Sequence, residues 1–168
     1  MIQVEELHYR YAGAARDALQ GLDFTIQKGE IFGFLGPSGS GKSTTQKLLF
    51  KLLAGYTGTA RIDGREVRDW GPELYERIGV GFELPNHYLK LTALENLNFF
   101  RNFYPRSNDP MQLLEQVGLG DDAHKKVADY SKGMKMRLNF IRAFLHDPDI
   151  LFLDEPTSGL DPVNARLV

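Results

Sequence analysis

The chain has 168 residues, of which 20 are basic and 22 acidic, and it carries a formal net charge of −2 and no cysteine. Its length and its 42% hydrophobic content fit one folded domain and exclude a disordered or fibrous chain. The near-neutral charge gives no bulk attraction to nucleic acid or an anionic membrane, and the lack of cysteine excludes disulfides, thiolate zinc sites and a cysteine nucleophile. No uncharged apolar run approaches the length of a bilayer span, so we expect a soluble chain that reaches a membrane only through a partner.

The first third of the sequence predicts a small β portion, a buried strand and a helix, in that order. Strand-like patterns extend over 2–9 and 22–26, with small and polar residues between them that suit a hairpin or a loop. The nearly continuous apolar run 31–35 predicts a strand buried on both faces. A helix is expected over 43–53, ended by Gly55.

Further strands are predicted later in the chain. A strand-and-turn region is expected over 60–67, a strand over 77–82 and a second fully buried strand over 149–153. The sequence then predicts a turn at Ser158-Gly159 and a helix opened by Asp161-Pro162. Buried strands that alternate with helices are typical of an α/β core with a parallel sheet.

Capping residues mark the beginnings of three helices in the second half. Thr92 begins a capping box, and Asp109 precedes a proline that suits the first turn of a helix. Ser131 precedes apolar residues at helical spacing that run to Leu145. The mostly helical stretch over about 92–145 therefore predicts a helical lobe inserted into the α/β core.

Residues 36–43 match the P-loop pattern in full, between a predicted buried strand and a predicted helix. Glycines allow backbone N–H groups to point at phosphate oxygens, and the N-terminus of the helix adds a partial positive charge. Lys42 would reach the β- and γ-phosphates, and Ser43 would offer its hydroxyl to Mg²⁺. The alternative is a glycine-rich turn with a solvated lysine, which the joint match of strand, spacing and helix disfavours. The predicted nucleotide-binding residues here are Gly36, Ser38, Gly39, Ser40, Gly41, Lys42, Ser43 and Thr44.

Two adjacent carboxylates, Asp154 and Glu155, follow the last predicted buried strand. Asp154 would hold Mg²⁺ through its water shell, and Glu155 would polarise a water molecule in line with the γ-phosphate. Acidic residues at the end of a strand are by themselves more often a solvated turn. Their pairing with the P-loop favours the functional interpretation.

Together these residues resemble the nucleotide-binding domain of ATP-binding cassette (ABC) transporters, and the likeness covers the whole chain in order. Tyr11 falls where the family places an aromatic that stacks on adenine, and residues 130–134 resemble the family signature. The loop 158–161 follows the catalytic glutamate as it does in the family. The implied fold is a P-loop NTPase core with a parallel sheet, an N-terminal antiparallel β portion and the helical lobe, in one domain over 1–168 truncated at its C-terminus.

The signature segment offers groups that suit an anion. Ser131 at a helix N-cap, followed by Gly133, presents a hydroxyl, bare amides and the positive end of a dipole. By spacing alone, Ser131 is better explained as a plain helix N-cap. Tyr11 taken alone is as well explained as a packed aromatic side chain as by contact with adenine. The resemblance implies instead that this edge binds the γ-phosphate of ATP held by a second subunit's P-loop, with Asp161 near the interface of a head-to-tail dimer.

The sequence departs from the family at two points. The family usually has a glutamine after the strand that ends here at Phe82, close to Mg²⁺, the attacking water and the membrane subunit; this chain has Glu83. A carboxylate could still bind Mg²⁺, but it adds negative charge near the γ-phosphate. We therefore hypothesise a stronger Mg²⁺ dependence or a slower turnover than with glutamine. The alternative is that Glu83 is an ordinary acidic residue on the surface. The family's switch histidine lies beyond Val168, and we expect all four histidines here to be solvated or partly packed.

The resemblance implies an ATPase that converts ATP and water to ADP and phosphate to drive export. It also implies ATP and Mg²⁺ as cofactors, transmembrane permease subunits and a second nucleotide-binding domain as partners, and a cytoplasmic place on the inner face of the membrane. The implied catalytic residues are Glu155, Lys42 and Glu83, and the implied metal ligands are Ser43, Glu83 and Asp154.

The form of the signature, with Lys135 after it, resembles the ABC-2 branch of exporters. One alternative is a soluble ABC protein of translation or DNA maintenance. The single cassette argues against a translation factor, and the absence of heptads between Lys42 and Asp154 argues against a DNA-maintenance protein. Another is a nucleotide-binding module without turnover. Nucleic acid is not an expected partner.

Overall fold

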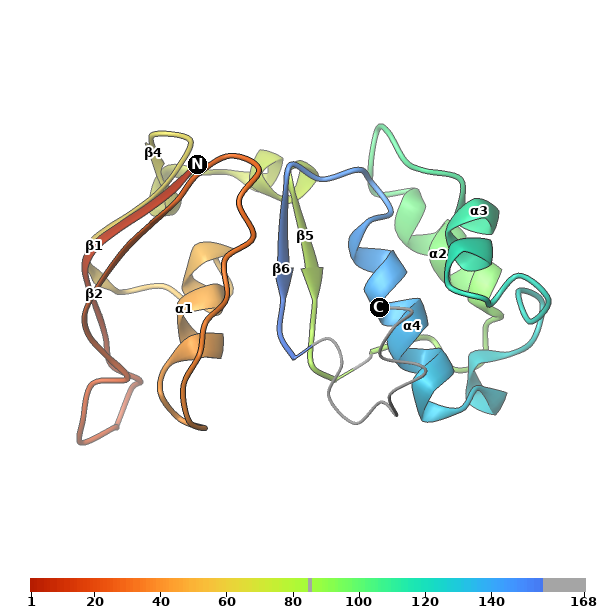
Figure 1. Cartoon of the computed structure of the whole chain (residues 1–168), viewed down its shortest axis with the longest axis horizontal. Helices are drawn as coiled ribbons and strands as arrows, with labels where there is room; N and C mark the ends of the chain where they lie inside the picture. Colours follow the sequence, from red (N-terminus) through yellow and green to blue (C-terminus); the bar gives the residue numbers. More distant parts are fainter. Residues whose placement is uncertain (85, 156–168) are drawn as a thin grey trace. The chain divides into compact units, whose positions relative to one another are not determined.

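The computed structural model describes residues 1–84 and 86–155, which divide into two compact units at the bond between Leu74 and Tyr75 (Figure 1). The predicted turn at Ser158-Gly159 and the predicted helix at Asp161-Pro162 lie outside these residues. Within the described residues, no helix combines the length and the apolar character needed to cross a bilayer.

The first unit is built on an antiparallel sheet of four strands in the order β2-β1-β3-β4. Its strands are β1 (Ile2–Tyr9), β2 (Leu19–Ile26), β3 (Thr57–Ile62) and β4 (Arg65–Glu66). The predicted antiparallel β portion is confirmed, with β2 beginning three residues before the predicted strand. The region predicted over 60–67 is the hairpin of β3 and β4, followed by a short 3-10 helix over Val67–Asp69.

The helix of the first unit, α1 (Lys42–Leu49), is shorter than predicted. It ends because Lys51 adopts a left-handed conformation with φ 59°, and the Leu52 N–H then turns back to the Lys47 carbonyl at 2.8 Å. This is the geometry of a Schellman cap, usually made by glycine. Lys51 Nζ donates to the carbonyl oxygens of Arg68 and Trp70, which fixes the side chain of this unusual cap.

The prediction of a buried strand over 31–35 is wrong for this structure. The segment has no strand assignment, and Ile31 and Leu35 are almost fully exposed. Its other side is packed, because the rings of Phe32 and Phe34 lie 5.3 and 5.4 Å from the ring of Phe24 on β2. An apolar run becomes a strand only where a neighbouring strand pairs with its backbone, and among the described residues no strand pairs with this one.

The second unit contains a parallel pair of strands, β5 (Ile78–Gly81) and β6 (Ile150–Leu153). The prediction of two parallel strands here is confirmed, but the full burial predicted for 149–153 is wrong: in β6 only Phe152 is buried. Each strand of such a pair satisfies one edge of its partner, and the faces of the pair are left to be covered by other elements. One such element approaches Gly79, where an added Cβ would lie 2.0 Å from the Ala143 carbonyl oxygen, so this position must be glycine.

Three helices of the second unit begin at the predicted caps. They are α2 (Ala93–Arg101), α3 (Pro110–Gln116) and α4 (Lys132–Ala143), and a short 3-10 helix covers Val127–Asp129. Thr92 forms the complete capping box with Glu95, and Asp109 accepts a hydrogen bond from the Met111 N–H. The last helix ends two residues before the predicted Leu145. The helices share a core of buried side chains: Ala93, Leu97, Leu113, Leu114, Val117, Leu119, Ala123, Val127, Tyr130, Leu138, Ile141 and Leu145.

Candidate functional site

In the first unit, the P-loop residues form an exposed turn that runs directly into α1. Gly41 is the N-cap of α1, with a left-handed φ of 93°. An added Cβ would lie 2.5 Å from Leu19 Cδ2 and 2.9 Å from the Ala18 carbonyl oxygen, so both the backbone conformation and the space require glycine. The Gly41 carbonyl accepts hydrogen bonds from the Thr45 N–H and hydroxyl, which secures the first turn of the helix. The open N–H groups of this turn suit an anion.

Lys42 reaches back over the loop. Its Nζ donates to the carbonyl oxygens of Gly36 at 2.9 Å and Pro37 at 3.0 Å. The Ser40 N–H donates to the same Pro37 carbonyl, which closes the turn beneath the ammonium group. The charge of Lys42 is therefore held by neutral carbonyl groups, which phosphate oxygens can replace with a stronger, charge-assisted bond.

Tyr11 lies at the first turn of α1. Its hydroxyl is 3.0 Å from Thr44 Oγ1, and its ring meets the ring of Tyr9 edge-on with centroids 5.0 Å apart. The structure thus brings the aromatic singled out in the sequence to the helix that carries Lys42 and Ser43. The ring is 39% exposed. Its stacking on adenine stays a prediction.

In the second unit, three predicted acidic residues follow the carboxyl ends of β5 and β6. The strands pair in parallel, Gly81 opposite Leu153, and the Asp154 N–H donates to the Gly81 carbonyl at 2.9 Å. Glu83 follows β5 by two residues, and Asp154 and Glu155 follow β6 directly. Asp154 is half-buried, whereas Glu83 and Glu155 are exposed.

Glu155 has a left-handed backbone with φ 48°, which is uncommon for a residue with a side chain. Such conformations are concentrated at functional sites. Among the described residues, no group of three acidic or histidine side chains could hold a metal ion. The oxygen donors of Ser43 and Asp154 suit Mg²⁺, which keeps part of its coordination for phosphate oxygens and water, so the residue types fit the ion.

Ser131 is the N-cap of α4, and its Oγ accepts a hydrogen bond from the Met134 N–H at 3.2 Å. The structure therefore confirms that the Ser131 side chain caps this helix. Ser131 is exposed and Gly133 lies in the first turn of the same helix. Binding of a phosphate from a second subunit at this helix stays a prediction, and Asp161 lies outside the described residues.

Two of the histidines, His87 and His146, are wholly or partly buried. His146 is buried, its ring stacks on Tyr104 with centroids 3.9 Å apart, and Nε2 lies 2.9 Å from the Ile78 carbonyl oxygen. The pKa of His146 is lowered, chiefly by burial. Burial also lowers the pKa of His87 to about 4. Burial thus favours the neutral form of both rings.

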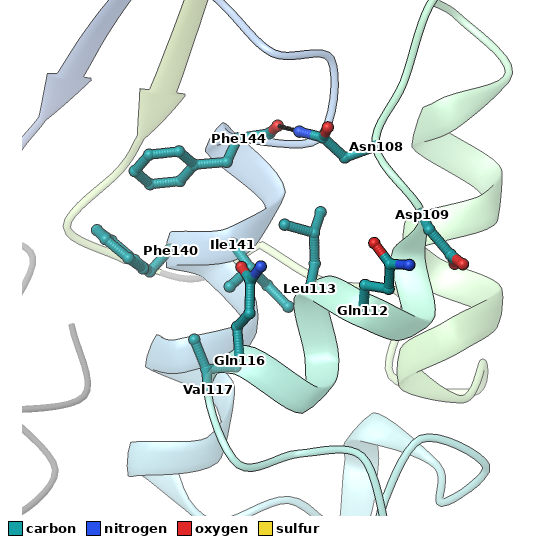
Figure 2. A pocket seen from close by; sticks show the side chains of 9 residues that line it. All are labelled: Asn108, Asp109, Gln112, Leu113, Gln116, Val117, Phe140, Ile141 and Phe144. Atoms are coloured by element: carbon teal, nitrogen blue, oxygen red, sulfur yellow. Dashed lines mark hydrogen bonds between the residues drawn. The ribbon is translucent and has the colours of Figure 1, made fainter.

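No role was predicted for Asn139 and Arg142 of α4, which donate hydrogen bonds to the loop that carries Glu83. The sequence signal that could have identified these two residues is that both are polar and lie beside the buried Leu138 and Ile141 in the same helix. A hollow of about 340 Å³ lies between α3 and α4 (Figure 2). No predicted site residue lines it; its lining residues are Asn108, Asp109, Gln112, Leu113, Gln116, Val117, Phe140, Ile141 and Phe144.

Comparisons with known proteins agree on one family. Residues 19–158 match the family described as ABC transporter. The chain is 60% identical over its whole length to the fluoroquinolones export ATP-binding protein MT2762 of Mycobacterium tuberculosis, of which it covers 56%. It is 40% identical over 86% of its length to the bacitracin transport ATP-binding protein BcrA of Bacillus licheniformis, of which it covers 48%. The chain thus spans about half the length of these curated relatives.

A solved structure shows the same fold. The ATP-binding cassette MJ0796, solved as a dimer in a post-hydrolysis state bound to ADP and Pi, matches with a TM-score of 0.87 and 27% sequence identity. The match covers 99% of this chain and 79% of that one, which confirms the predicted α/β cassette fold. The chain belongs to the ABC transporter family and carries its ATP-binding domain.

Proposed function

We propose that this chain binds and hydrolyses ATP as the ATP-binding part of an ABC exporter. The observation that carries the proposal is the first-unit site: a complete P-loop at the N-terminus of α1, with the Lys42 ammonium held over it by the carbonyls of Gly36 and Pro37. This cation and the open N–H groups suit two or more phosphate oxygens. The Tyr11 ring at the same turn supports a base beside the phosphates.

The proposed hydrolysis step assigns one role to each predicted site residue. Lys42 would bind the γ-phosphate, and Ser43, Asp154 and Glu83 would supply oxygen atoms for Mg²⁺. Bound Mg²⁺ would neutralise charge that develops on the phosphate oxygens. A carboxylate oxygen of Glu155 accepts a proton from the attacking water, whose oxygen bonds to the γ-phosphorus as the bond to the β-phosphate oxygen breaks. The products are ADP and phosphate.

The exposed N-terminus of α4 supports a shared site. In the proposed head-to-tail dimer, Ser131 and Gly133 of one cassette contact the γ-phosphate on the P-loop of the other, and Asp161 lies at the interface. The dimeric structure of the related MJ0796 cassette supports this arrangement. ATP bound at both interfaces would close the dimer, and hydrolysis would reopen it. In this proposal 1–168 is one cassette domain, with residues of about 92–145 as its helical lobe.

An exposed apolar surface supports a membrane subunit as partner. In the second unit, the residues Leu84, Tyr88, Leu89, Phe99 and Phe103 are each 39% to 77% exposed. The rings of Tyr88 and Phe99, and of Phe99 and Phe103, are in edge-on contact. Because exposed apolar clusters mark interaction sites, we propose that a transmembrane permease subunit docks here and holds the chain at the cytoplasmic face of the membrane. The names of the relatives support export. We assign the chain to the ABC-2 branch from the form of its signature and from Lys135.

The test compares ATP hydrolysis by this chain with that of Glu155→Gln, and uses Glu76→Gln as the control at an exposed acid of the second unit. We expect turnover in the chain and in the control, and a loss of more than about a hundredfold in Glu155→Gln with nucleotide binding retained. Binding without turnover in all three proteins would favour the module that only binds nucleotide. Co-purification with ribosomes instead of a membrane protein would favour the translation alternative.

Glu83 gives a second, finer test of the same proposal. Its carboxylate adds negative charge near the γ-phosphate, so Glu83→Gln should raise turnover or lower the Mg²⁺ concentration needed for half-maximal rate. An unchanged rate and an unchanged Mg²⁺ titration would assign Glu83 to the surface instead.

A further inference from the structure

Two side chains of α4 bond to the loop after β5 on either side of Glu83. Asn139 Nδ2 donates to the Phe82 carbonyl oxygen at 2.7 Å. Arg142 Nη1 donates to the Asn86 carbonyl oxygen, also at 2.7 Å. The loop is therefore attached to the helix before and after the residue that stands in the predicted site.

A third bond joins the same loop to the same helix face. His87 Nε2 lies 3.0 Å from the carbonyl oxygen of Lys135. Lys135, Asn139 and Arg142 follow one another at intervals of four and three residues, so they lie on one face of α4. These contacts attach loop residues before and after Glu83 to this face of α4, so the loop cannot move away from the helix without losing a bond.

The two side chains also hold each other. Arg142 Nη2 donates to Asn139 Oδ1 at 2.9 Å, so the Asn139 amide donates to the loop and accepts from the arginine at once. Asn139 is only 3% exposed. An amide donates and accepts through two different atoms, whereas a carboxylate lacks the donor and an aliphatic group lacks both.

Arg142 is a partly buried cation whose guanidinium contacts neutral groups. Its guanidinium lies 4.8 Å from the centre of the Phe100 ring, and burial lowers the pKa of Arg142 below its ordinary value. A buried guanidinium is costly unless its N–H groups are satisfied. The carbonyl of Asn86 is one of the acceptors that satisfy it, so helix and loop depend on each other.

The bond from Asn139 fixes the peptide group that leads into Glu83. The Phe82 carbonyl and the Glu83 N–H belong to one planar unit, so holding the carbonyl oxygen fixes the direction in which the Glu83 Cα follows. Phe82 comes directly after β5, whose Gly81 carbonyl accepts the Asp154 N–H. The amide of Asn139 thereby sets Glu83 relative to Asp154 and Glu155.

We propose that Asn139 is a positioning residue for Glu83: together with Arg142 it ties the Glu83 loop to α4, so that Glu83 is held at the carboxyl ends of β5 and β6. The proposal rests on the proposed ATPase function of this site. It also makes α4, whose N-cap is Ser131, a rigid connection between the signature segment and Glu83.

The test is Asn139→Asp, with Asn108→Asp as the matched control. Aspartate keeps an acceptor for Arg142 but loses the donor to Phe82. Asn108 makes the same kind of bond, from Nδ2 to the Phe144 carbonyl at 2.8 Å, but this bond is made to the C-cap of α4 and not to the loop that carries Glu83. We expect Asn139→Asp to lower kcat about tenfold or more with KM for ATP changed less than about threefold, because a small misplacement of a reacting group acts on kcat. The control should stay within about twofold.

A second variant separates positioning from general damage. In a Glu83→Ala background, Asn139→Asp should lower kcat by less than about twofold, because residues that act through one group are not additive. Amide hydrogen exchange over 82–84 and 86–91 should become faster in Asn139→Asp than in Asn108→Asp. Equal effects of the two aspartates, an undiminished loss in the Glu83→Ala background, or unchanged exchange in the loop would each overturn the proposal. Absence of turnover in every protein, including the unmodified chain, would refute the ATPase proposal, and the exchange comparison would still decide whether Asn139 holds the loop.

Discussion

Replacing Gly41 by alanine should destabilise the first unit by about 2–5 kcal/mol. The residue has φ 93°, and a residue with a Cβ in a left-handed conformation costs about 1–2 kcal/mol. The added Cβ would also lie 2.5 Å from Leu19 Cδ2 and 2.9 Å from the Ala18 carbonyl oxygen. The leucine methyl can rotate away, but the carbonyl belongs to the backbone before β2, and such overpacking costs about 1–3 kcal/mol more.

Gly39 is the matched control for Gly41, since it has φ 80° in the same loop but no atom within 4 Å of an added Cβ. Gly39→Ala should cost only the conformational part, about 1–2 kcal/mol. Trp70 is the single tryptophan of the chain and lies in the first unit, so its fluorescence during urea titration reports the unfolding of that unit. Equal losses in the two variants, within about 0.5 kcal/mol, would refute the steric argument.

Three further predictions concern the second unit. Thr92→Ala removes the acceptor of the capping box and should cost about 1 kcal/mol in urea unfolding, whereas Thr92→Ser should restore most of it. Leu138→Ala removes a fully buried side chain from the helical core, and the free energy of unfolding of the second unit in urea should fall by about 2–5 kcal/mol. A loss under about 1 kcal/mol would mean that the core collapses around the gap. His87 has a pKa of about 4 against an ordinary 6.5, so the unfolded chain binds the proton more tightly and stability should fall as pH drops from 6.5 towards 4. His87→Gln should flatten that part of a stability curve measured against pH, and an unchanged slope would contradict the burial of the ring.

The sequence by itself determined the features that depend on neighbouring residues. Caps at Thr92, Asp109 and Ser131 were predicted at the residues where the helices begin, because a cap is a bond between a side chain and an N–H group two or three residues later. The P-loop was predicted from its spacing and from its place between a predicted strand and a predicted helix, and its glycines and Lys42 act within eight residues. The family resemblance, confirmed by the comparisons, rested on motifs of the same local kind.

Burial and pairing were decided by the tertiary structure. The apolar run 31–35 and the strand β6 have similar composition, yet the run forms no strand and β6 pairs with β5, because a strand needs a partner that may be far away in the sequence. The end of α1 also depends on distant residues, because the Lys51 side chain donates hydrogen bonds to the carbonyl oxygens of Arg68 and Trp70.

The attachment of the Glu83 loop to α4 also came only from the tertiary structure. Asn139 and Arg142 lie more than fifty residues from the carbonyls they contact, and in the sequence they are two polar residues in an amphipathic helix. Motifs identify the residues that touch a phosphate because that chemistry is local. The residues that hold such groups in place act through contacts between distant segments, and only the folded chain brings those segments together.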